Sequence, residues 1–67
     1  MPPKRIKAVL RAVERGLTVT VFLVEQDRDP VFQAEDFVDT FDEAEGLANR
    51  HAIRLGIPLR DVIIEES

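Results

Sequence analysis

The most regular apolar pattern of the chain lies over residues 40–55. At about 100° per residue, one helical face would collect Phe41, Ala44, Leu47, Ala48, Ala52 and Leu55. Thr40 and Glu43 have the spacing of a capping box at the start of this pattern. Gly56 follows its end as a left-handed stop. We therefore predict a helix over residues 40–55, around which the rest of the chain packs.

A second periodic stretch covers residues 4–15. Its apolar residues follow the helical spacing i, i+3, i+4 and i+7, and they are Ile6, Val9, Leu10 and Val13. Gly16 comes next and suits the position after a helix end. These signals predict a short amphipathic helix. A strand is the less favoured alternative, because the apolar residues here do not alternate.

Three segments have strand character. Residues 17–25 are rich in β-branched and aromatic side chains, and Leu17, Val19, Val21 and Leu23 would line one face. Residues 26–30 form a turn, and residues 31–38 are expected to pair antiparallel with the first strand. Phe37 breaks the alternation of this second strand, which indicates a bulge or a strand end near residues 35–36. Residues 60–65 form the last predicted strand.

These elements predict one small α+β domain over residues 1–67, with the order α-β-β-α-β. A basic amphipathic helix would occupy residues 1–16, and residues 17–67 would form a ββαβ core. In that core, a three-stranded, mainly antiparallel sheet is packed by the central helix.

Residues 19–52, VTVFLVEQDRDPVFQAEDFVDTFDEAEGLANRHA, carry a resemblance to known proteins. They resemble small bacterial domains of unknown function that are built as strand–turn–strand–helix–strand. In those domains a T-F-x-x-x-x-E-A or F-D-x-x-x-E-A pattern opens the helix, as Thr40-Phe41-Asp42-Glu43-Ala44 partly does here. The resemblance covers about residues 17–67. It implies a fold and carries no catalytic residues.

Composition limits the classes of protein that this chain can represent. A chain of 67 residues with 45% hydrophobic residues can build a core, but a thin one. Self-association as a homodimer or higher oligomer is a common remedy for a thin core. The absence of cysteine excludes disulfides and cysteine-based zinc sites, and no apolar run approaches the length of a membrane span. We expect a soluble cytoplasmic protein.

Catalytic chemistry finds little support in the residues. There is one histidine, His51, and the single serine, Ser67, is the last residue. Three isolated glycines make no phosphate loop. We expect a protein that is not an enzyme, with no catalytic residues, no cofactor and no metal. His51 is expected to border the core with a bonded ring nitrogen, and a pH switch is the alternative. A hard-cation site is the less favoured interpretation of the carboxylates Glu35, Asp36, Asp39, Asp42 and Glu43.

Charge is unevenly distributed along the chain. Residues 1–16 hold five basic residues against Glu14, a net +4, whereas the whole chain carries −4. The candidate partner-binding residues are the basic side of the first predicted helix: Lys4, Lys7, Arg11 and Arg15. A solvated face, a protein partner, nucleic acid and an anionic membrane surface all remain open for them. A second stripe, Gly46, Asn49 and Ile53, could contact the first helix or a second subunit.

The function expected from these features is a non-enzymatic protein-interaction or regulatory module. The alternatives are a nucleic-acid-binding accessory protein that uses the N-terminal helix, and an acidic decoy that binds a basic protein surface.

Overall fold

The structure is a computed structural model that describes residues 4–67. Its elements, in chain order, are β1 (Lys4–Val13), β2 (Gly16–Glu25), β3 (Val31–Val38), α1 (Phe41–Leu55), the 3-10 turn η1 (Leu59–Asp61) and β4 (Val62–Glu66). The four strands form one sheet in the order β3-β2-β1-β4. β1 and β2 are antiparallel, as are β2 and β3, whereas β4 runs parallel to β1. The α+β class is confirmed, but the sheet is mixed and four-stranded.

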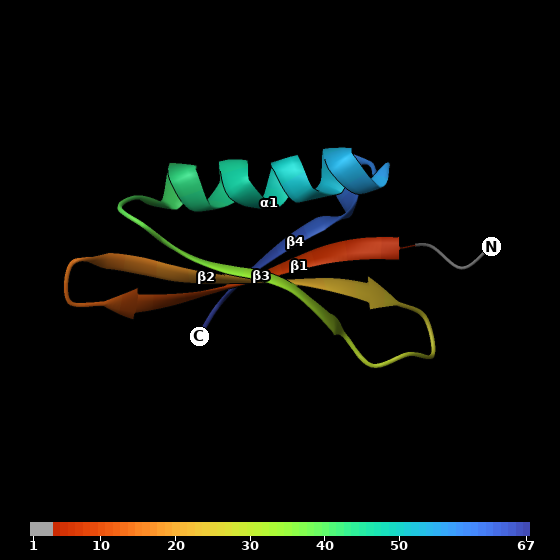
Figure 1. The fold of residues 1–67 in the computed structure, drawn as a ribbon, viewed down its shortest axis with the longest axis horizontal. Helices are drawn as coiled ribbons and strands as arrows, with labels where there is room; N and C mark the ends of the chain where they lie inside the picture. Colours follow the sequence, from red (N-terminus) through yellow and green to blue (C-terminus); the bar gives the residue numbers. More distant parts are fainter. Residues whose placement is uncertain (1–3) are drawn as a thin grey trace.

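The described chain forms two layers, with α1 lying across one face of the sheet (Figure 1). The opposite face of the sheet has no element over it in the same view. α1 connects the edge strand β3 to β4 at the other edge, so the connection crosses over the sheet on the helical side. This one-sided cover decides which side chains remain available to a partner.

The core lies between α1 and the two central strands. Ile6, Val19 and Val21 are its largest fully buried side chains. From α1 the fully buried residues are Ala44, Ala48 and Ala52, which recur every fourth position and face the sheet. Alanine lets the helix backbone approach the strands closely, but it contributes little buried area. The core is therefore thin, as the chain length predicted.

The prediction of an N-terminal helix is wrong, since residues 4–13 form strand β1. Ile6, Ala8 and Leu10 are buried and alternate with half-buried or exposed residues. With Ala8 included, the buried residues of β1 recur at every second position. This alternation is hard to see in the sequence, because Ala8 is small and the larger Val9 and Val13 lie on the opposite face of the sheet. Glu14 and Arg15 form a two-residue hairpin loop, and Val13 pairs with Gly16 across it. Ten residue pairs between β1 and β2 stabilise the strand, although the spacing of its larger apolar residues is helical.

The central helix is confirmed at both ends. The Thr40 hydroxyl accepts a hydrogen bond from the Glu43 backbone N–H at 3.2 Å. The Glu43 carboxylate returns to the backbone N–H of Asp39 at 3.5 Å, one residue earlier than a standard capping box would place it. Gly56, with φ 72°, ends the helix in the left-handed conformation.

The irregularity of β3 lies earlier than predicted. Phe32 pairs with Phe22 and Ala34 pairs with Val21, so Gln33 is the extra residue of a bulge. The expected bulge at residues 35–36 is absent, since both residues have regular partners in β2. The last predicted strand is present as β4, which begins two residues later than expected because η1 occupies Leu59–Asp61.

Candidate interaction surface

The sheet face opposite α1 is the candidate functional surface, and we call it the open face. Residues paired across antiparallel strands project to the same side of a sheet, so the register assigns each side chain to a face. Ile6, Ala8 and Leu10 point to the helix, and their alternating neighbours in β1 therefore belong to the open face. The same register places alternate residues of β2, β3 and β4 beside them.

Three rows of side chains cross the open face, two of them from one sheet edge to the other and the third from β3 to β1. In the strand order β3-β2-β1-β4 the rows are Phe32–Phe22–Lys7–Ile63, Glu35–Thr20–Val9–Glu65 and Phe37–Thr18–Arg11. The pairs Val24–Arg5 and Gly16–Val13 extend the face at its two ends. An antiparallel sheet that faces water on one side usually carries polar side chains there. Large apolar side chains occupy many of these positions instead.

The aromatic side chains gather on the half of the open face that β2 and β3 form. The Phe22 and Phe32 rings meet edge to face, with centroids 6.3 Å apart and planes at 77°. Phe32 is 59% exposed and Phe37 is 56% exposed. The bulge at Gln33 shifts the alternation, so Phe32 and Phe37 share a face although five positions separate them. This half therefore presents a platform of three phenylalanines to solvent.

The cationic side chains of the open face follow β1. They are Arg5, Lys7 and Arg11, at every second or fourth residue of the strand. Lys7 forms an ion pair with Glu65 of β4, with 3.2 Å between Nζ and Oε2. On the aromatic half, the Thr20 hydroxyl donates to Glu35 Oε2 at 3.2 Å. Both carboxylates thus lie on the outer strands, and the cations lie on a central strand.

Two of the four predicted basic residues reach this surface. Lys7 and Arg11 belong to the open face, whereas Lys4 has the opposite parity at the start of β1 and Arg15 lies in the hairpin loop. Arg5 replaces them as the third cation of the face. In a strand, the residues that alternate with Ile6 share the opposite face. A strand prediction for this segment would therefore have grouped Arg5 with Lys7 and Arg11. The three phenylalanines were missed because only the strand register brings them together.

Two residues of the predicted stripe on α1 face open space, since nothing lies within 4 Å of a Cβ placed on Gly46 and Ile53 is 66% exposed. Asn49 is half-buried. The first predicted helix is strand β1 in the structure, so the predicted contact between two helices is wrong. A contact with a second subunit remains a prediction for this stripe.

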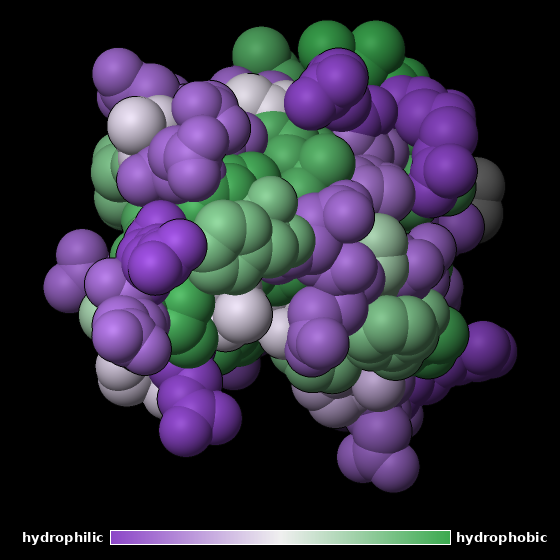
Figure 2. Space-filling view, turned by 60° about the vertical axis from the view of Figure 1, so that its left-hand side comes forward, coloured by the Kyte–Doolittle hydropathy of each residue, from purple (hydrophilic) through white to green (hydrophobic). Residues whose placement is uncertain are grey.

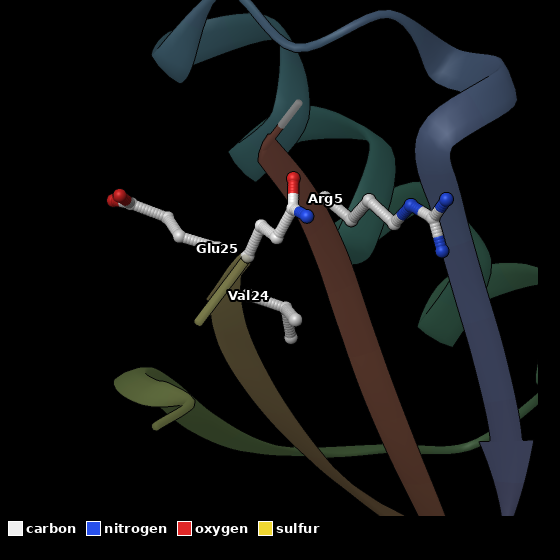
Figure 3. Close-up of a pocket in the computed structure, with 4 residues that line it drawn as sticks. Arg5, Val24 and Glu25 are labelled. Carbon is white, nitrogen blue, oxygen red and sulfur yellow. The ribbon is translucent and has the colours of Figure 1, made fainter. Parts of the chain in front are cut away.

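Three of the surface hollows bear on the site, and the third of them, about 220 Å³ on α1, is lined by Leu47, Arg50, His51 and Arg54. The first, about 360 Å³ in volume, is lined by Arg5, Val24, Glu25 and Gln26. Arg5 and Glu25 extend in opposite directions there, and Val24 points toward neither (Figure 3). A second hollow of about 280 Å³ lies beside Phe41 and Leu17 at the hairpin end of the molecule. The view from that end shows hydrophobic side chains at the surface between hydrophilic ones (Figure 2).

His51 is half-buried on α1, and its ring makes the hydrogen bond expected of a histidine at the edge of the core. Arg54 Nη2 lies 3.0 Å from Nδ1. Arginine can only donate, so Nδ1 accepts and the ring is neutral. Burial, followed by the positive charge of Arg54, lowers the pKa of His51. Asp36 of β3 raises this pKa and Arg50 lowers it further, both with smaller effects.

Within residues 4–67, the His, Asp and Glu side chains form no group of three or more that could hold a metal ion. Among those carboxylates, Glu43 instead caps α1. In the same part of the chain, no helix is long and apolar enough to cross a membrane.

Comparison with known proteins gives no relative from which a function could be transferred. No protein-family model, curated protein or solved structure matches the chain. A function can therefore be proposed only from the surfaces of this chain.

Proposed function

We propose that this chain is a non-enzymatic protein-interaction module and that the open face is its binding surface. The observation that carries the proposal is the set of phenylalanines on an uncovered sheet face. Phe32 and Phe37 are more than half exposed, and Phe22 lies beside Phe32. The Phe22–Phe32 pair and Phe37 lie on either side of the Thr20–Glu35 pair, and exposed aromatic side chains gathered on one face are typical of protein interfaces.

The energetics favour a protein as the occupant. The core buries few large side chains, whereas phenylalanine, valine and isoleucine side chains reach the open face. Domains usually bury a sheet on at least one face against a second layer, and a further layer over an apolar open face would remove that surface from water. Each phenylalanine that becomes fully buried contributes about 1.5–3 kcal/mol. Aromatic anchors of this kind dominate binding energies at interfaces.

The test is affinity capture from nuclease-treated lysate of the source cells, with tagged wild-type protein and two variants as bait. Phe37→Glu places a charge on the open face. Ile53→Glu makes the same change of charge on the outer side of α1, at a position with comparable exposure. Partner chains should be captured by wild type and by Ile53→Glu, and lost with Phe37→Glu. Equal capture by all three baits would refute the open face as the binding surface.

A second candidate function is the binding of single-stranded nucleic acid. The observation that favours it is the row in which Lys7 lies next to Phe22 and Phe32, because bases stack on aromatic rings while cations bind phosphates. The overall charge of −4 opposes it. Arg11→Glu should abolish binding of a labelled oligonucleotide in fluorescence anisotropy, whereas Arg15→Glu, in the hairpin loop, should retain it. Absence of salt-dependent binding by wild type would remove this candidate.

A further inference from the structure

We propose that the protein which covers the open face is a second copy of this chain, packed face to face about a two-fold axis. The inference rests on the proposed function, because it names the partner for the same surface. The product would be a four-layer assembly, with the two sheets inside and the two copies of α1 outside.

The first argument is that the open face is self-complementary. A two-fold interface uses the same patch on both copies, so the patch must match itself. The open face is divided lengthwise, with Phe22, Phe32 and Phe37 on β2 and β3 and the cations on β1. A two-fold axis that runs along the strands between β1 and β2 places each aromatic half opposite the other copy's cationic half.

The second argument concerns the charges. Rotation about this axis leaves each row at the same position along the strands and reverses its order across them. Phe22 of one copy therefore lies opposite Lys7 of the other. Lysine and arginine can cover a ring with their aliphatic stems and place their charge near its face. The same axis brings Glu35 of one copy opposite Glu65 of the other, on the outer strands, where the hydrated rim of the interface screens the two carboxylates. The ion pair between Lys7 and Glu65 can persist in the assembly, because both residues belong to the same copy.

The third argument is the size of the surface. Strands lie about 4.8 Å apart and rise about 3.3 Å per residue, so strands of 10, 10, 8 and 5 residues present a face of roughly 500 Å². Two copies would bury roughly 1,000 Å², which is the lower limit of a specific interface. This area predicts a reversible dimer that forms between roughly 1 µM and 1 mM protein.

Strand addition at the edge of the sheet is the less favoured route to a dimer. β3 is the longer edge strand, and it contains the bulge at Gln33. It also carries the neighbouring charges Glu35 and Asp36, one on each face of the sheet. Bulges and charges on an edge are features that oppose pairing with a second sheet.

The test is sedimentation equilibrium of the purified protein over the stated concentration range. Wild type should dimerise, and Phe37→Glu should raise the dissociation constant at least tenfold. Ile53→Glu, the matched control on α1, should change it less than twofold. Because the Phe37 ring lies close to Gly16, Phe32→Glu provides a second open-face variant if the first does not fold. Urea unfolding establishes that each variant is native.

The axis can be tested separately, since the chain contains no cysteine. The two-fold arrangement places Glu35 of one copy opposite Glu65 of the other, and it keeps the two copies of each residue on opposite edges of the interface. A mixture of Glu35→Cys and Glu65→Cys proteins with a short bis-maleimide should give mainly the mixed product. A predominance of either same-site product would overturn this axis.

The outcomes separate this inference from the proposed function. A wild-type protein that stays monomeric to 1 mM, while Phe37→Glu still abolishes capture of another protein from lysate, overturns the second copy and retains the interaction surface. A monomer with no capture that depends on Phe37 overturns both. Association that requires added nucleic acid also overturns the second copy.

Discussion

Gly16 provides a quantitative test of the hairpin that replaces the predicted N-terminal helix. Its φ of 156° is open to glycine and strained for other residues. A Cβ at this position would lie 2.4 Å from the backbone oxygen of Val38 and 3.0 Å from Cζ of Phe37. The oxygen belongs to the β2–β3 ladder and cannot move without disturbing it.

The expected cost of Gly16→Ala combines two effects. The strained backbone costs about 1–3 kcal/mol, and overpacking against fixed backbone costs about 1–3 kcal/mol more. The sum of about 2–6 kcal/mol is a large share of the roughly 3–10 kcal/mol that holds a domain of this length folded. If Gly16 instead followed a helix as its left-handed cap, alanine would cost only about 1 kcal/mol.

Urea unfolding followed by circular dichroism measures this cost, with Gly46→Ala as the matched control. Nothing lies within 4 Å of a Cβ at Gly46, so alanine there should stabilise the helix by about 1 kcal/mol. The same chemical change should therefore have opposite signs at the two glycines. A Gly16→Ala protein within about 1 kcal/mol of wild type would refute the close approach of the hairpin to β3.

Three further predictions concern α1 and β4. Thr40→Ala should lower the free energy of unfolding by about 1 kcal/mol in urea titrations, because the Glu43 N–H loses its acceptor; an unchanged midpoint would contradict the cap. The folded-state pKa of His51 is lowered, so its contribution to stability is complete above about pH 6.5 and is lost as the pH falls through the folded pKa. Wild type should therefore lose more stability than His51→Gln between pH 7.5 and pH 5, and equal losses would contradict the lowered pKa that burial and Arg54 give to His51. Glu65→Gln should change the free energy of unfolding by less than about 1 kcal/mol, because its ion pair is solvent-exposed; a larger loss in the same titration would mean that the pair is buried.

The local signals of α1 were sufficient to predict it. A cap, an apolar face and a glycine stop all belong to consecutive residues, and tertiary contacts agree with them. In the N-terminal segment, the local apolar pattern and the tertiary contacts favour different structures. Val9 and Val13 gave it a helical spacing, but they lie on the open face, while the small Ala8 is buried. A sheet that is apolar on both faces conceals the alternation by which strands are recognised.

The composition of the open face could be predicted only in part for a related reason. Lys7 and Arg11 were among the four predicted basic residues, but the predicted helix grouped them with Lys4 and Arg15 and left out Arg5. The aromatic half depends on pairing between strands and on the bulge at Gln33. Neither can be read from the spacing of Phe32 and Phe37, because the extra residue changes which side chains share a face.

The central claim is that a protein covers the open face, and the chain's four phenylalanines provide the most direct measurement. Phe22, Phe32 and Phe37 belong to the open face, whereas Phe41 lies at the start of α1. Aromatic NMR signals of phenylalanine-labelled protein, recorded over a dilution series and with captured partner added, report on each ring. The account predicts shifts for the three open-face rings and a constant signal for Phe41. Shifts confined to Phe41, or association that leaves all four rings unchanged, would contradict it.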